Sequence, residues 1–82
     1  MVIFILTKNG FEEMKSHIST TTSPVWVNDG VLSEAELEKY RKSGFDITNF
    51  SYRIEKDNID EIKGALETIK EHHPEQNIWT EL

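Results

Sequence analysis

The sequence predicts a single small α/β domain over residues 1–82, with two or three layers around a mostly parallel sheet. The first observation is the apolar run at 2–6, which is typical of a strand covered on both faces. The second is the alternation of short apolar runs with amphipathic segments, the pattern of strand–helix–strand units. The third is the segment 24–54, where a strand, a turn, a capped helix and a returning strand follow one another.

The first strand is expected at Val2–Leu6, where three β-branched residues and a phenylalanine favour the middle of a sheet. A short helix should follow. Its apolar residues Phe11, Met14 and Ile18 recur at helical spacing, and Asn9 is the predicted N-cap.

The next unit is predicted most sharply. Ser19–Pro24 is polar and ends with a proline, so we expect a loop, followed by a short strand at 25–27. Ser33 with Glu36 three residues later is the signature of a capping box at the start of a second helix. Gly44 is the predicted end of that helix.

The returning segment 45–54 contains an irregularity. Phe45 and Ile47 lie on one parity, whereas the apolar residues from Phe50 onward lie on the other. A straight strand cannot bury both sets on one face, so we expect a bulge or bend near 48–49. The alternation in the second half predicts a strand near the sheet edge with one wet face.

A third helix should start at Asp57 or Asn58 and stop before Pro74. The residues 77–80 then predict either a short edge strand or a tail that packs one aromatic ring against the body. Right-handed crossovers and the doubly apolar first strand favour the strand order 2-1-3, or 2-1-3-4 if the tail pairs. The expected core consists of Ile3, Phe4, Ile5, Ile62, Leu66 and Ile69.

The composition of the chain argues against several classes of partner and site, as its charge, cysteine content and apolar runs indicate. The net charge is −6, and the excess acids lie in 29–82, so neither nucleic acid nor an anionic membrane is an expected partner. The absence of cysteine excludes disulfides and thiolate zinc sites and is typical of a reducing compartment, so we expect a cytoplasmic protein. The longest apolar run is far shorter than the ~20 residues that span a bilayer.

Polar residues follow the first two predicted strands. Parallel sheets bind ligands beyond the carboxyl ends of their strands, where the strand order reverses, and the predicted order puts that point between strands one and two. Two turns and two helix starts meet there, so a small polar pocket is one hypothesis; the simpler one is that the same residues only cap helices and form turns. The candidate ligand-binding residues are Lys8, Asn9, Asn28, Asp29 and Ser33.

No set of residues predicts catalysis, a cofactor or a metal. The chain has no phosphate-binding loop and no dinucleotide fingerprint. His72 and His73 are adjacent and therefore point to different sides of a helix, so they are better explained as favourable charge at a helix C-terminus. A lone histidine such as His17 does not indicate a catalytic triad.

The aromatic residues predict an interface. Two helices on one face of a small sheet and one on the other leave part of the sheet uncovered, so one interpretation puts Trp26 on a thinly covered face with Trp79 or Tyr52. The simpler interpretation is that Trp26 packs under the first helix, because tryptophan is usually mostly buried.

The leading functional hypothesis is a small intracellular domain without catalysis that acts by protein–protein contact, including self-association as a homodimer. The first alternative is a ligand-binding or enzymatic domain that uses the pocket around Lys8 and Asp29. The second is an acidic mimic of nucleic acid, which depends only on the charge.

Overall fold

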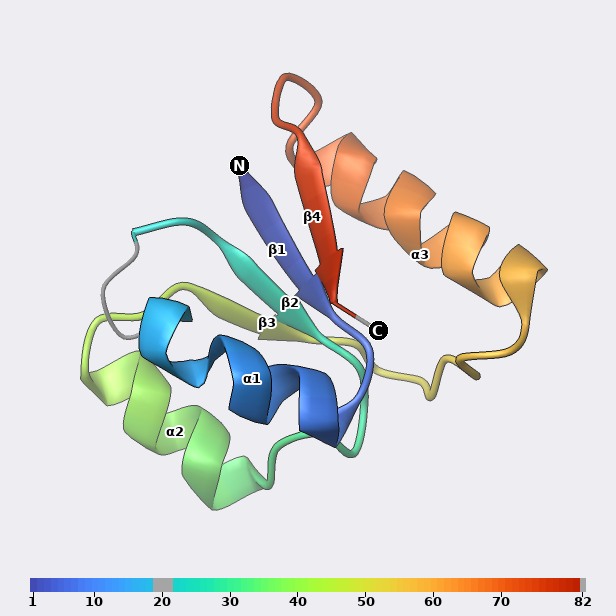
Figure 1. Cartoon of the computed structure of the whole chain (residues 1–82). Coiled ribbons are helices and arrows are strands. Elements are labelled where there is room, and N and C mark those ends of the chain that lie inside the picture. The colour runs from blue at the N-terminus through green and yellow to red at the C-terminus, as the bar shows by residue number, and fades with distance from the viewer. Residues whose placement is uncertain (19–21, 82) are drawn as a thin grey trace.

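The computed structural model describes residues 1–18 and 22–81, and over these residues the chain forms four strands and three helices (Figure 1). The strands are β1 (Val2–Ile5), β2 (Val25–Val27), β3 (Ile47–Asn49) and β4 (Ile78–Glu81). The helices are α1 (Lys8–Ile18), α2 (Glu34–Lys42) and α3 (Ile59–His72). All strand pairs are parallel, so the predicted small α/β domain is confirmed.

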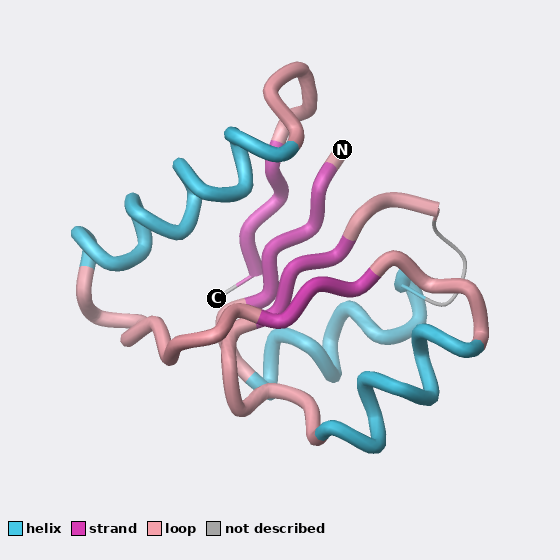
Figure 2. Tube along the Cα trace, turned by 180° about the vertical axis from the view of Figure 1, so that it is seen from behind, coloured by secondary structure: helices cyan, strands magenta, loops and turns pink. Residues whose placement is uncertain are grey.

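The domain has three layers. Helices α1 and α2 lie together on one face of the sheet and α3 lies on the other, as Figures 1 and 2 show from opposite sides. Successive residues of β1 point to opposite faces and join two separate cores. The core under α1 and α2 contains Ile3, Ile5, Phe11, Ile18, Val25, Val27, Val31, Leu32, Leu37 and Ile47. The core under α3 contains Val2, Phe4, Leu6, Trp26, Phe50, Ile54, Ala65 and Ile69.

The strand order is β3-β2-β1-β4, so the predicted order 2-1-3(-4) is wrong. The apolar first strand does lie inside the sheet, but its second neighbour is β4 rather than β3. The reason is that α1 and α2 cross the same face, which adds β2 and β3 in one direction. The crossover through α3 uses the opposite face, and it returns the chain to the free side of β1.

The predicted strand at 50–54 is also wrong. A bend does follow Asn49, but the chain then leaves the sheet and runs as an irregular segment toward α3. Phe50 and Ile54 are buried on the α3 face, while Tyr52 is exposed. The alternation of apolar and polar residues therefore reflects a covering segment that buries every fourth residue.

The helix ends agree with the sequence except at α1. The hydroxyl of Thr7, rather than the side chain of Asn9, accepts from the Gly10 amide at 3.0 Å. Ser33 forms the predicted capping box with Glu36, and Asn58 caps α3.

Four of the six predicted core residues are buried, and Ile62 and Leu66 are partly buried against the core under α3. The predicted loop 19–24 falls partly outside the described residues, and 22–24 belong to no helix or strand. No helix in the described part of the chain is long and apolar enough to cross a membrane.

Candidate functional site

A pocket of about 260 Å³ opens at the carboxyl ends of β1 and β2. Of the five predicted ligand-binding residues, Lys8, Asn28 and Asp29 line it. Asn9 lies in the first turn of α1 and Ser33 caps α2, and neither belongs to the lining. The polar turns after two neighbouring strands therefore meet as the sequence suggested, but the helix-capping residues do not join them.

The segment between β3 and α3 supplies the far wall of this pocket. It contributes charged side chains that the sequence does not single out, because the alternation in 50–54 is typical of an edge strand. Arg53 and Glu55 form an ion pair at 3.5 Å, with both side chains largely exposed. The charged lining residues of this wall are Arg53, Glu55, Lys56 and Asp57.

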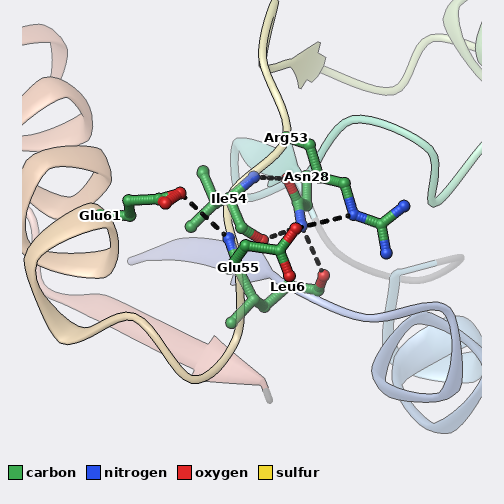
Figure 3. A network of polar contacts seen from close by, with 6 residues as sticks. All are labelled: Leu6, Asn28, Arg53, Ile54, Glu55 and Glu61. Atoms are coloured by element: carbon green, nitrogen blue, oxygen red, sulfur yellow. Dashed lines mark hydrogen bonds and ion pairs between the residues drawn. The ribbon is translucent and has the colours of Figure 1, made fainter.

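Asn28 is the one buried polar side chain among the described residues, and it acts as a clamp (Figure 3). Its Nδ2 donates to the carbonyl oxygens of Leu6 at 3.0 Å and Ile54 at 2.8 Å. Its Oδ1 accepts from the amide of Ile54 at 2.8 Å. Both N–H donors of the side chain are used, so Asn28 joins the end of β1 to the 50–54 segment like a piece of strand backbone.

The strand order reverses between β1 and β4, not between β1 and β2 as expected from the sequence. This reversal point is filled by the protein itself. A Cβ added to Gly10 in the first turn of α1 would lie 3.0 Å from Cγ of Glu81 and 3.2 Å from its carbonyl oxygen. The end of β4 therefore packs directly against the start of α1, at the place where an open parallel sheet usually holds its ligand.

Trp26 is 6% exposed and lies under α3, not under the first helix. Its ring centroid is 5.3 Å from that of Phe50 and 5.2 Å from that of His72, and His73 adds an edge-on contact at 6.2 Å. The indole Nε1 has no hydrogen-bond partner among the described residues. His72 and His73 therefore help to bury Trp26.

The other two predicted interface residues are exposed. Tyr52 is 47% exposed, and its ring packs edge-on against Phe50 at 5.6 Å. Trp79 is 52% exposed and lies on β4, the edge strand opposite β3. Because Trp79 pairs in register with Ile3, its side chain points to the face of α1 and α2. Those helices leave it half uncovered.

The outer side of β4 carries unpaired backbone. The carbonyls of Asn77 and Glu81 accept from the amides of Val2 and Leu6, so these residues direct their polar groups toward β1. In a parallel ladder alternate residues face opposite sides, so Ile78 and Thr80 direct N–H and C=O away from the sheet. No hydrogen bond among the described residues reaches these outward groups.

The capping box at the start of α2 shifts the pKa of one carboxyl group. The Ser33 backbone N–H donates to the Glu36 carboxylate at 3.0 Å and, with the Ser33 hydroxyl, holds the pKa of Glu36 below its ordinary value. Ser33 is thus fully engaged in capping α2.

Over residues 1–18 and 22–81 no group of three His, Cys, Asp or Glu side chains is placed to hold a metal ion.

Comparisons of the chain with models of protein families, with curated proteins and with solved structures give no match. Its function is therefore inferred from the geometry of the pocket and of the β4 edge.

Proposed function

We propose that this chain is a small non-catalytic domain that acts by protein–protein contact through the outer edge of β4. The observation that carries the proposal is the half-exposed ring of Trp79 beside the unpaired backbone of Ile78 and Thr80. Strand edges of this kind accept a further strand from a partner, and an exposed tryptophan is among the residues that contribute most to binding. Trp26 is buried and lies on β2, so it is not part of this surface.

The absence of cysteine supports a place of action in the cytoplasm, where thiols are kept reduced and disulfides are rare. The acidic mimic of nucleic acid is a weaker proposal, because it rests only on the net charge of −6.

A second candidate is a ligand-binding or enzymatic domain that uses the pocket, and the meeting of Lys8 and Asp29 in one lining favours it. Two features rank it below the interaction proposal. The volume of about 260 Å³ is below the ~300–1,000 Å³ typical of small-molecule sites. The deepest polar side chain, Asn28, already uses its hydrogen-bonding groups within the fold.

The test is a capture experiment from native cell extract with the purified chain as bait. The variants are Trp79→Ala, a Lys8→Ala/Asp29→Ala double substitution and, as a matched control, Tyr52→Ala, which removes a similarly exposed ring away from β4. Circular dichroism first establishes that each variant is folded. We expect Trp79→Ala alone to lose its partner, because removing an interface tryptophan typically costs ~2 kcal/mol or more of binding. If only the double variant loses its partner, the pocket rather than the β4 edge is the binding site.

A further inference from the structure

We infer that the partner of the β4 edge is a second copy of this chain, with the two β4 strands paired antiparallel about a two-fold axis at Trp79. The inference rests on the proposed function, since it names the partner of the same edge. Closed two-fold pairs are the commonest form of self-association, because one surface serves both subunits.

The backbone of β4 fits this register. An antiparallel axis through Trp79 sets Ile78 of one copy opposite Thr80 of the other, and the reverse. Both residues direct N–H and C=O outward, so each pair exchanges two hydrogen bonds. An axis at Ile78 would set Thr80 against Gln76 in the preceding turn, and an axis at Thr80 would set Ile78 beyond the described end of β4. Only the axis at Trp79 pairs all four outward groups within β4 itself.

The side chains fit the same register. Trp79 directs its own N–H and C=O toward β1, so the two Trp79 residues form the non-hydrogen-bonded pair, whose Cα atoms lie about 4.5 Å apart. Opposite residues in an antiparallel pair point to one face, so both indoles lie on the face of α1 and α2. Each Trp79 is 52% exposed in the single chain, and pairing gives its ring an aromatic neighbour at the closest cross-strand position.

Charge does not oppose this pairing of two copies. The chain has a net charge of −6, so most self-contacts would oppose acids. In this register the one charged residue of β4, Glu81, lies opposite the neutral Asn77. Ile78, Trp79 and Thr80 carry no charge, and β4 contains none of the lysines or prolines that commonly prevent edge pairing.

The experiment is sedimentation velocity of the purified chain over a range of concentrations. Its variants are Trp79→Ala, Thr80→Pro and the control Tyr52→Ala. Thr80→Pro removes an outward N–H that the single chain does not use, at an edge position where proline is tolerated. We expect the wild type and Tyr52→Ala to form dimers with the same dissociation constant. We expect Trp79→Ala and Thr80→Pro to weaken the dimer at least about tenfold.

Three results would overturn the inference. A wild type that stays monomeric at every concentration would show that β4 binds something else, such as an extended segment of another protein. In that case the extract experiment with Trp79→Ala still decides the proposed function separately. A dimer insensitive to Trp79→Ala would place the contact elsewhere, and a dimer sensitive to Trp79→Ala but not to a folded Thr80→Pro would exclude strand pairing. If circular dichroism shows Thr80→Pro unfolded, Trp79→Ala alone decides.

Discussion

The two edge strands of the sheet treat their outward backbone differently. On β3 the carbonyl of Ile47 faces outward, and Nε of Arg41 in the last turn of α2 donates to it at 3.2 Å. The chain then leaves the sheet after Asn49, so β3 offers only three residues. On β4, four residues pair with β1, and Trp79 is half-exposed. Among the described residues, no side chain covers the outward backbone of β4 as Arg41 covers that of β3.

The difference follows from how each strand is approached. Helix α2 packs against the strand that follows it, so a side chain of its last turn reaches the edge of β3. The polar groups near β4 instead serve the turn that precedes it. Nζ of Lys70 donates to the carbonyl of Gln76, and the N-terminal amine donates to the Gln76 side chain. One edge is therefore protected by its own crossover, whereas the other is left available.

The largest expected effect tests the contacts of Asn28, which hold the 50–54 segment after β3 against the end of β1. Asn28→Ala should lower the free energy of unfolding by about 3 kcal/mol, because three buried backbone groups of Leu6 and Ile54 lose their partners. Urea titration measures this. The control is Asn49→Ala, which removes two contacts of a half-buried side chain at the end of β3 and should cost less. Equal losses in the two variants would mean that Asn28 is not the clamp.

A pair of glycines tests the support of β4. Gly10→Ala should lower the free energy of unfolding by about 1 kcal/mol, because the new Cβ meets the backbone of Glu81 and overpacking costs ~1–3 kcal/mol. Gly64→Ala, within α3, meets nothing within 4 Å and should raise it by about 1 kcal/mol through helix propensity. Thermal and urea unfolding measure both. A gain of the same size at Gly10 would show that α1 does not press against β4.

Capping of α2 tests the helix that covers β3. Ser33→Ala should lower the free energy of unfolding by about 1 kcal/mol, since it removes the hydroxyl that accepts from the Glu36 amide. Ser33→Asp is the matched control, because aspartate caps equally well and should retain the stability. Unchanged stability in Ser33→Ala would show that the Ser33 cap does not stabilise α2.

The smallest effect depends on pH. The lowered pKa of Glu36 means that its carboxylate stabilises the fold above its unfolded pKa, and that this contribution disappears as the pH falls through the lower folded pKa. The wild type should exceed Glu36→Gln in stability at pH 7, and the difference should shrink as the pH falls below 4.5, the ordinary value. Urea titrations across pH measure it. A difference that grows toward acid would have the wrong sign.

Much of the fold could be predicted because local signals agreed. The capping box of Ser33, the cap at Asn58 and the doubly apolar first strand each report a local environment, and the structure has them. Strand order was not predictable in the same way, because an apolar strand indicates an interior place without identifying its neighbours. The alternation after Asn49 does not identify a strand for a related reason: an irregular segment that buries Phe50 and Ile54 and exposes Tyr52 between them has the same pattern of apolar and polar residues.

The pocket residues could be predicted only in part. Lys8 and Asp29 directly follow strands, and parallel strands bring such turns together. Arg53 and Glu55 come from a segment whose path depends on Asn28, which no local pattern reports. The helix that buries Trp26 was equally hidden, because the packed position depends on which helix crosses the second face of the sheet.

Amide hydrogen exchange at both edges, followed residue by residue at low and high protein concentration, tests the difference between them most directly. The outward amides are those of Ile78 and Thr80 on β4 and of Ile47 and Asn49 on β3. We expect exchange at Ile78 and Thr80 to slow as the concentration rises, while exchange at Ile47 and Asn49 stays the same. Rates that do not depend on concentration at any of the four, or slowing on β3 instead, would contradict an open and self-pairing β4 edge.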